Sequence, residues 1–345
     1  MSKRETGKPR CVLWLRPEQA ALAHEVVEAA GLVVESVGSP EAGAAVALAE
    51  SLRAPSGSDL RATLAETRAS LVLMLDPGDL GVDMRAAEFR ALREARARGV
   101  RLLSLEPVPA TVLSLASHGD EPEGTGVETV RFTPLLRDSR RFREAADVVQ
   151  QFGRVRTLSI EVLGSPTTGS LGAMLYSGLD LVHALLGVPE TLDATYVSTQ
   201  ESRGLIAVAG DTLRGLGGDL TAMCRFADGR CATIVASDHA ARWNRTITLL
   251  GASGRLRIYD DGFELLDPAG KKVDEARQRR TSKSLSHATA AIVDAVERAL
   301  DPHAASTRPV DELSVLSAAQ AALLSTRTGQ PESPETIRRM VGRES

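Results

Sequence analysis

The chain has 345 residues, which is enough for two domains that each bury a hydrophobic core. Hydrophobic residues make up 43% of it and charged residues 25%, a composition typical of folded globular proteins and one that excludes disorder over the whole chain. The net charge is −4 and arginines alternate with acidic residues, so we expect no nucleic-acid partner and no attraction to an anionic membrane.

The start of the chain, residues 1–16, contains only a short apolar run, too short for the core of a signal peptide. No apolar stretch reaches the length of about 18 residues that a membrane span needs. The three cysteines are sparse, as in proteins of a reducing compartment. We therefore expect a cytoplasmic protein without a membrane segment, in which Cys11, Cys224 and Cys231 are small buried residues and not metal ligands.

The first third of the chain alternates short apolar runs with helical patterns. A Pro at a first helical position begins the pattern at 17–30, and helix-forming residues with paired charges fill 83–98. This alternation predicts a Rossmann-like, doubly wound parallel sheet with helices on both faces. The predicted strands are 11–16, 32–37, 70–76 and 101–105.

A polar, glycine-containing stretch at 118–126 lacks periodicity and is the best linker candidate. We therefore place a domain boundary there, with a first domain at 1–126 and a second at 127–345. The second domain opens with a strand-like segment at 127–134, a helical one at 139–153 and a further strand at 155–163.

Residues 193–267 consist of short alternating segments separated by turns such as ADG, GASG and DDG, which is typical of an antiparallel sheet. One of these segments is GLIAVAG at 204–210. Two amphipathic helices follow at 286–300 and 311–328. The second domain is thus predicted to be α+β, with an open and predominantly antiparallel sheet.

Several stretches, in this order, resemble the glucose-fructose oxidoreductase and inositol dehydrogenase family (Gfo/Idh/MocA). The resemblance implies a Rossmann domain followed by an open-sheet domain, an NAD or NADP cofactor, and a sugar or cyclitol substrate. It spans nearly the whole chain. The stretches are RLLSLEPVPAT at 101–111, VRFTP at 130–134, GAMLYSGLDLVHALLG at 172–187, FADGRCATIVAS at 226–237, TITLLGASGRLRI at 246–258 and LSAAQAALLSTRTGQP at 316–331.

The turn that would bind the cofactor departs from the family pattern. Members carry Gly-x-Gly-x-x-Gly there, because absent side chains let backbone amides approach the pyrophosphate. Residues 15–20 of this chain contain no glycine. Pro17 removes an amide donor and Glu18 places a carboxylate beside the phosphates, while Arg16 could attract an anion. We expect no cofactor, and NAD or NADP if the protein is active.

Two further cofactor features also differ. Glu35 lies inside the apolar run 32–37 and not at its end, where a ribose-binding acid is expected. An ion pair or the polar side of the sheet suits it better. After the third predicted strand, Asp76-Pro77-Gly78 stands where members often carry Thr-Pro.

The catalytic positions are altered as well. The resemblance implies a Glu-Lys-Pro motif whose lysine contacts cofactor and substrate, but here Glu106 falls on its Glu or Lys position, depending on register, and no lysine is present. The family helix with Asp, Gly, His and Asp is matched by Tyr176, Gly178, Asp180 and His183. Asp180 and His183 share a helix face, so they could form an acid/base pair or a polar patch between the domains.

Three functional hypotheses follow. The first is a non-catalytic or altered oxidoreductase homologue that binds a small polar, sugar-like ligand or a partner in the interdomain cleft, around Glu106, Tyr176, Asp180 and His183. The second is an active NAD(P)-dependent sugar or cyclitol dehydrogenase with a non-standard cofactor site. The third is a structural subunit. His239 and Trp243 could contact a ligand or a neighbouring subunit. Apolar residues on both phases of the later strands predict a homo-oligomer joined through the C-terminal sheet.

Overall fold

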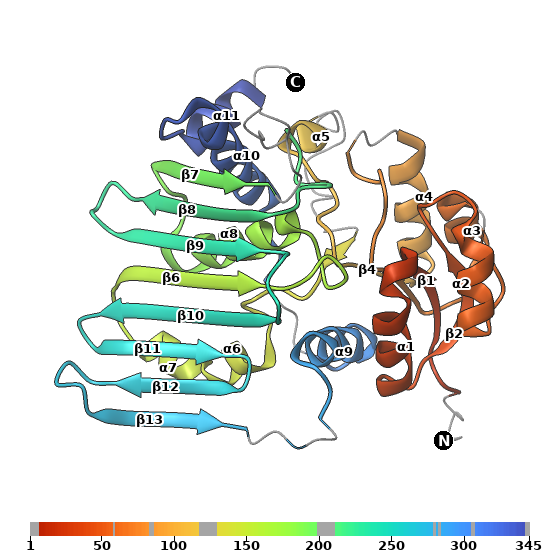
Figure 1. Cartoon of the computed structure of the whole chain (residues 1–345), viewed down its shortest axis with the longest axis horizontal. Helices are drawn as coiled ribbons and strands as arrows, with labels where there is room; N and C mark the ends of the chain where they lie inside the picture. Colours follow the sequence, from red (N-terminus) through yellow and green to blue (C-terminus); the bar gives the residue numbers. More distant parts are fainter. Residues whose placement is uncertain are drawn as a thin grey trace.

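The protein is described by a computed structural model that covers residues 7–57, 59–82, 86–116, 130–198, 211–278, 281, 284–304 and 308–341. It contains two sheets that lie side by side, with one helix, α9, between them (Figure 1). The predicted linker 118–126, with its boundary at 126/127, and the predicted strand 204–210 lie outside the described residues.

The first sheet is parallel and has the order β2-β1-β3-β4-β5. Its strands are β1 Arg10–Trp14, β2 Val33–Gly38, β3 Leu71–Met74, β4 Arg101–Ser104 and β5 Arg131–Phe132. The four strands predicted in this region are confirmed. Residues 131 and 132, which the sequence suggested as part of the second domain, pair with β4 and form the edge of this sheet instead.

Helices connect these strands in the manner expected of a doubly wound sheet. They are η1 Pro17–Gln19, α1 Ala20–Ala29, α2 Ala44–Leu52, α3 Leu60–Glu66, α4 Ala86–Ala97 and α5 Val112–Ala116. Between α2 and α3, Ser56 forms a single parallel bridge with Val37 of β2. Counted as a strand, this bridge gives the order typical of Rossmann domains, in which a further strand lies outside β2.

The second sheet has eight strands in the order β13-β12-β11-β10-β6-β9-β8-β7. Its neighbours are antiparallel except for β6 and β9, which run parallel. The prediction of an open and predominantly antiparallel sheet is therefore confirmed. The strands are β6 Val155–Leu163, β7 Thr191–Val197, β8 Asp219–Arg225, β9 Cys231–Ser237, β10 Asn244–Gly251, β11 Gly254–Tyr259, β12 Gly262–Leu266 and β13 Lys272–Arg277.

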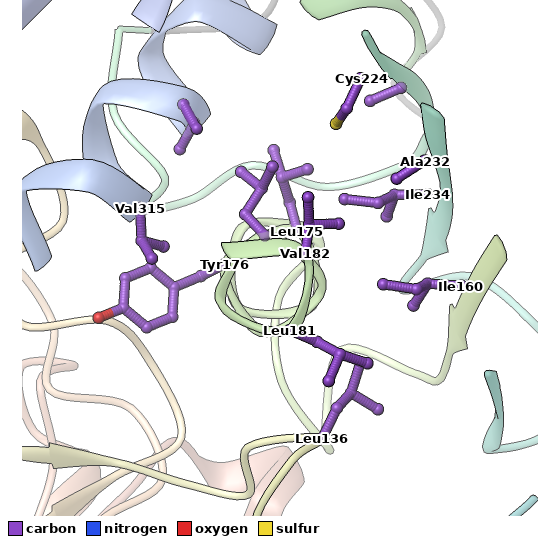
Figure 2. Packing of buried hydrophobic residues seen from close by; sticks show 14 of the residues in the cluster. Leu136, Ile160, Leu175, Tyr176, Leu181, Val182, Cys224, Ala232, Ile234 and Val315 are labelled. Carbon is purple, nitrogen blue, oxygen red and sulfur yellow. The ribbon is translucent and has the colours of Figure 1, made fainter. Parts of the chain in front are cut away.

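Helices cover one face of the second sheet, behind the strands in Figure 1. The central one, α8, is buried along most of its length, and its Leu175 and Val182 contribute to the core that Ile160 and Ile234 line from the sheet (Figure 2). Gly178 lets the helix lie close to the sheet, because a Cβ there would come within 3.1 Å of Ile234. The helices are α6 Arg140–Glu144, α7 Ala146–Gln151, α8 Leu171–Leu186, α10 Glu312–Thr328 and α11 Pro334–Val341.

The helix α9, His287–Leu300, follows the second sheet in the chain but packs into the core of the first. Its Ile292, Val293 and Val296 share a cluster with Leu13 of β1 and Leu73 of β3. The C-terminal part of the chain therefore completes the parallel-sheet unit, which ties the two units together.

Among the described residues, no helix covers the outward face of the second sheet (Figure 1). Strand β8 alternates buried and exposed residues along its whole length. The residues that face outward include threonine, serine and arginine beside the apolar Met223, Val235 and Leu250. This face is therefore less apolar than the sequence pattern suggested.

Cys11 and Cys224 are buried, which raises the pKa of each thiol to about 12, so the prediction of small buried residues holds for both. Cys231 is half-buried. Within the part of the chain described, we find no helix both long enough and apolar enough to cross a membrane.

Candidate functional site

Three backbone amides in the turn after β1 already donate hydrogen bonds to carbonyls of this chain. The amide of Leu15 bonds the Gly38 carbonyl, that of Gln19 bonds the Arg16 carbonyl, and that of Ala20 bonds the Pro17 carbonyl. Pro17 has no amide hydrogen. Because backbone donors bind a pyrophosphate only when they are free, this turn does not fit the phosphates of a dinucleotide.

Gln19 fixes the turn from inside. Its side chain is fully buried, its Oε1 accepts a hydrogen bond from the Arg16 amide at 2.9 Å, and its Nε2 donates to the Leu75 carbonyl at 3.2 Å. A glutamine side chain thus takes up the amide that a phosphate oxygen would otherwise bind. The sequence analysis did not single out Gln19, because a buried glutamine cannot be told from an exposed one by its neighbours in the chain.

The Arg16 side chain, the one predicted anion contact in this turn, is committed to carboxylates. Arg16 Nε lies 2.8 Å from Asp76 Oδ2 and 3.4 Å from Glu18 Oε1. Asp76 follows β3, so this pair joins the carboxyl ends of two neighbouring strands. It neutralises the charge that was expected to attract an anion.

The end of β2 offers no ribose-binding acid. Gly38 lies against the ring of Trp14, where a Cβ would come within 1.9 Å of the ring. Glu35 accepts hydrogen bonds from Thr67 and the Arg68 amide and forms an ion pair with Arg10 at 3.1 Å, so the prediction of an ion pair for Glu35 is confirmed. A cavity of about 250 Å³ does remain at this sheet edge, and Trp14, Pro40 and Pro77 are among its lining residues.

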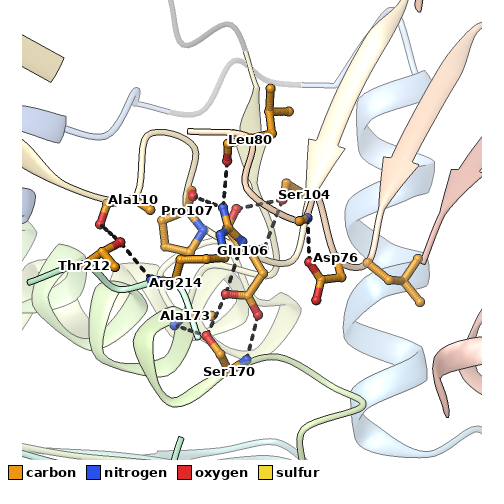
Figure 3. Close-up of polar contacts among 12 residues, drawn as sticks. Asp76, Leu80, Ser104, Glu106, Pro107, Ala110, Ser170, Ala173, Thr212 and Arg214 are labelled. Atoms are coloured by element: carbon orange, nitrogen blue, oxygen red, sulfur yellow. Dashed lines mark hydrogen bonds and ion pairs between the residues drawn. The ribbon is translucent and has the colours of Figure 1, made fainter. Parts of the chain in front are cut away.

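Glu106 lies two residues after the end of β4 and is buried at the junction of the two units (Figure 3). Its carboxylate accepts hydrogen bonds from the Ser170 amide at 2.8 Å and the Ser170 hydroxyl at 2.6 Å. Ser170 is the N-cap of α8, so Glu106 also lies at the positive end of that helix. Burial raises the pKa of Glu106 from its usual value, although Arg214 and the two Ser170 donors favour its charged form.

Arg214, from the segment 211–218, pairs with Glu106 across the junction. Its Nη1 lies 3.6 Å from Glu106 Oε2, and its Nη2 donates to the carbonyls of Leu80 and Pro107 at 3.1 and 2.8 Å (Figure 3). Burial lowers the pKa of this guanidinium below its usual value, against the opposing effects of Glu106 and Asp76. The side chain therefore joins the second unit to two loops of the first.

The segment around Arg214 is held on both sides. Leu213 donates its amide to the Ala110 carbonyl at 3.0 Å, and Leu171 at the start of α8 donates to the Leu216 carbonyl at 3.1 Å. Gly172 makes this contact with α8 sterically possible, because a Cβ there would lie 2.0 Å from the Leu213 oxygen. The sequence analysis missed both Arg214 and Ser170; only the Ser170-Leu171-Gly172 step at the start of α8 gives a local signal, that of an N-cap.

Asp180 pairs with Arg137 and not with His183. Arg137 Nε donates to Asp180 Oδ2 at 2.6 Å, and both side chains are buried. Burial raises the pKa of Asp180, and Arg137 opposes this shift. The expected hydrogen bond between Asp180 and His183 is not formed, because the buried guanidinium is a stronger partner for the carboxylate than the imidazole one helical turn away.

The other two candidates on α8 contact Asp311 and Phe132. His183 Nε2 is 3.7 Å from Asp311 Oδ2, at the N-cap of α10. The Tyr176 ring is buried, packs edge-on against Phe132 with centroids 5.0 Å apart, and lies beside Val315 (Figure 2). Neither Glu106 nor His183 lines the two cavities described in this structure.

The loop after β9 supplies a second carboxylate to the start of α8. Asp238 is buried and accepts hydrogen bonds from the Leu171 amide at 3.3 Å and the Gly218 amide at 2.7 Å. His239 Nδ1 lies 2.6 Å from Asp238 Oδ1. Trp243, further along this loop, stacks with its ring 5.0 Å from the Arg245 guanidinium.

Several solved structures with a similar fold are oxidoreductases by name. An oxidoreductase from Sinorhizobium meliloti is 15% identical with a TM-score of 0.66, covering 94% of this chain and 99% of its own. An oxidoreductase from Agrobacterium radiobacter in complex with NAD⁺, L-tartaric acid and magnesium is 14% identical with a TM-score of 0.64, covering 96% of this chain and 100% of its own. A myo-inositol dehydrogenase from Corynebacterium glutamicum is 17% identical with a TM-score of 0.61, covering 95% of this chain and 99% of its own.

No protein-family model matches the sequence, and no curated protein matches it. The likeness to the solved structures establishes the fold, a Rossmann-like unit followed by a large open sheet. A fold alone does not define an activity, which has to be argued from the residues of the site.

Proposed function

We propose that this protein is a divergent homologue of the NAD(P)-dependent sugar and cyclitol dehydrogenases, of the Gfo/Idh/MocA type, that has lost hydride transfer. One observation carries the proposal: charged side chains follow one another across the carboxyl edge of the parallel sheet, from Arg16 through Asp76 and Arg214 to Glu106. Each of these side chains already has an oppositely charged neighbour within the chain.

The same residues argue against a dinucleotide on electrostatic grounds. Asp76 and Glu106 are buried or nearly so and carry carboxylates at the sheet edge where open α/β sheets bind their ligands. Pyrophosphate charges would meet these carboxylates and Glu18, while the cations that could offset them are already paired. Inserting a cofactor would require breaking buried ion pairs, which is costly.

We further propose that Glu106, Ser170 and Arg214 now act as a brace between the two units. Their contacts link the loops after β3 and β4 to the start of α8. A protein braced in this way presents a fixed surface to a small polar ligand or a partner, in place of a cleft that opens for a cofactor.

The second candidate function is an active dehydrogenase of a sugar or cyclitol, supported by the fold of the NAD complex described above. In that case NAD or NADP would bind at a non-standard site. The cavity of about 250 Å³ lined by Trp14 and Pro77 is the feature that favours this second candidate. A structural subunit is the third candidate, favoured by the uncovered face of the second sheet.

Titration calorimetry and thermal unfolding with NAD, NADH, NADP and NADPH distinguish these functions. We expect no saturable heat and no rise in the melting temperature. A dinucleotide present at about 100 times its dissociation constant would add about 2.7 kcal/mol to the free energy of unfolding, which a melting experiment detects readily. Saturable binding of any of the four would overturn the proposal and support the active dehydrogenase.

A further inference from the structure

Arginines gather at the amino edge of the parallel sheet, the edge opposite to the Glu106 brace. Arg101 begins β4 and Arg131 begins β5, and the register of these strands pairs Arg131 with Leu103. Because side chains alternate along a strand, Arg101, Leu103 and Arg131 share one face of the sheet. Leu103 packs in the same cluster as Ile292 of α9, so both arginines lie on the face that α9 covers.

Three guanidinium groups from three elements meet around Asp138, in the loop between β5 and α6. Arg131 donates from Nη2 to Asp138 Oδ2 at 2.8 Å. Arg298, in the last turn of α9, donates from Nη1 to the Asp138 carbonyl at 2.9 Å, and Arg143 of α6 donates to the same carbonyl. Contacts with a single residue therefore hold the three side chains together.

The carboxylates at this place balance only part of the charge. Arg131 pairs with Asp138, and Arg143 holds Asp294 through two hydrogen bonds of 2.9 Å. Arg298 forms no ion pair with the described residues. Burial lowers the pKa of its guanidinium, and the charges of Arg143 and Arg131 act in the same direction, against the carboxylates of Asp138 and Asp294. Arg298 thus lies among like charges without a carboxylate of its own.

Arg101 adds a further positive charge beside Arg298. Its Nε donates to the Ala299 carbonyl at 3.2 Å, and it also forms no ion pair with the described residues. Glu297 and Asp301 flank this turn of α9, but neither pairs with one of these arginines in the part of the chain described. Two guanidinium groups therefore lack a carboxylate partner within the described chain.

The unused nitrogens of Arg298 and Arg131 are open to a ligand. Arg298 Nε and Nη2, and Arg131 Nε and Nη1, have no hydrogen-bond partner among the described residues, and none of these atoms is buried. The Nε and Nη2 atoms of Arg298 form one edge of the planar fork that matches two oxygens of a phosphate or carboxylate. A carboxylate is used up by one such fork, whereas a tetrahedral phosphate keeps oxygens for a second arginine.

We propose that Arg101, Arg131, Arg143 and Arg298, here called the Asp138 arginine cluster, bind a doubly charged phosphate group. Arg298 Nε and Nη2 are its main donors, Arg131 is the second contact, and the two unpaired charges match the dianion. The ligand is inorganic phosphate or a phosphomonoester. The proposal does not depend on the loss of hydride transfer, because the cluster shares no residue with the brace or with the turn at 15–20.

Phosphorus NMR of the full chain tests this site through the line broadening of orthophosphate and of glycerol 2-phosphate. The titration is made at constant ionic strength and at about pH 8, where a phosphomonoester is a dianion. We expect saturable binding of at least one probe, which acetate at the same ionic strength does not displace. Tighter binding of glycerol 2-phosphate would support a phosphorylated molecule as the ligand, and tighter binding of orthophosphate would support the free anion.

Arg298→Gln removes the main fork and should weaken the probe by about tenfold or more, while circular dichroism reports a folded protein. Arg156→Gln is the matched control, because Arg156 also donates to a backbone carbonyl, that of Gly251 at 3.1 Å, but lies in the second sheet. It should leave binding unchanged. Arg101→Gln, at an exposed position, removes only a nearby charge and should weaken the probe by about threefold.

Four results would overturn the proposal. Neither probe binds the folded wild type, acetate displaces the probe as readily as unlabelled phosphate does, or Arg156→Gln weakens binding as much as Arg298→Gln. The fourth is that folded Arg298→Gln binds as the wild type does. If Arg298→Gln does not fold, Arg101→Gln decides in its place, and unchanged binding by this variant overturns the proposal.

Discussion

Glu106 and Arg214 meet across the junction of the two units, with Arg214 Nη1 3.6 Å from Glu106 Oε2 and both side chains buried. Glu106 follows a strand of the parallel sheet, whereas Arg214 comes from a segment packed against α8 of the second unit. The pair occupies the carboxyl edge of the sheet, so it connects the proposed loss of a cofactor site with the stability of the chain.

The first prediction concerns that pair. Arg214→Met leaves the Glu106 carboxylate buried without its cation, so we expect the free energy of unfolding to fall by about 3–5 kcal/mol. Urea denaturation followed by circular dichroism measures this change. Arg154→Met, which removes an exposed ion pair with Asp228, is the matched control and should change stability by less than about 1 kcal/mol.

Removing both charges tests the cause of that loss. Because the penalty comes from an unpaired charge, the double variant Glu106→Gln with Arg214→Met should recover much of the stability lost in Arg214→Met alone. A single variant as stable as the wild type, or a double variant less stable than the single one, would contradict the role of the pair as a buried brace.

A second prediction follows from the raised pKa of Glu106. Its usual value is 4.5, and burial raises it in the folded state, so the folded protein binds a proton that the unfolded chain has released. The wild type should therefore lose stability relative to Glu106→Gln as the pH rises from 4.5 through the folded-state pKa.

Urea denaturation at several pH values between acid and neutral gives this difference. Glu50→Gln, at an exposed position of α2, should give a curve parallel to that of the wild type. If the difference between the wild type and Glu106→Gln stays constant with pH, or changes in the opposite direction, burial does not control this carboxyl group.

Much of the fold could be predicted from the sequence because its strands are short apolar runs and clear turn residues separate many of them. The runs at 11–16 and 70–76 become β1 and β3, and the turns ADG and GASG separate neighbouring strands of the second sheet. The place of α9 could not be predicted, since an amphipathic helix does not specify which of two cores receives its apolar face.

The site was less predictable, for a related reason. The sequence singled out Glu106 and the glycine-free turn, and both positions proved to be occupied by internal contacts. Arg214 and Asp238 lie in loops without periodicity, and their partners are far away in the chain. Asp180 and His183 share a helix face, but the choice of Arg137 as the partner of Asp180 depends on tertiary packing that spacing cannot reveal.

The third prediction concerns the turn after β1. Gln19→Ala removes the buried side chain that bonds the Arg16 amide and the Leu75 carbonyl, so two buried backbone groups lose their partner. We expect the free energy of unfolding to fall by about 1–3 kcal/mol, as measured by urea denaturation. Gln330→Ala, at an exposed position, should change it by less than about 0.5 kcal/mol. Equal effects of the two substitutions would show that Gln19 does not stabilise the turn.

The fourth prediction concerns assembly through the second sheet. No helix in the described part of the chain covers its outward face, and Met223, Val235 and Leu250 are 42%, 39% and 38% exposed on three of its strands. Threonines lie beside them on neighbouring strands, together with the charged residues Asp193, Glu161 and Arg255, and we expect this face to pair with a second copy of itself so that opposite charges meet across the two-fold axis. We expect a homodimer, or a dimer of dimers, that buries more than about 1,000 Å² per contact.

Multi-angle light scattering at micromolar concentration measures this assembly directly. Val235→Glu places a second carboxylate directly beside Glu161, on the central part of β9, and should convert the assembly to monomers because these like charges would be buried together without a cation. Val46→Glu, at an exposed valine of α2, should leave the oligomer intact, because that helix lies in the other unit. A monomeric wild type, or a Val235→Glu variant that remains a dimer, would rule out the outward face as the interface and leave the uncovered sheet to a different partner.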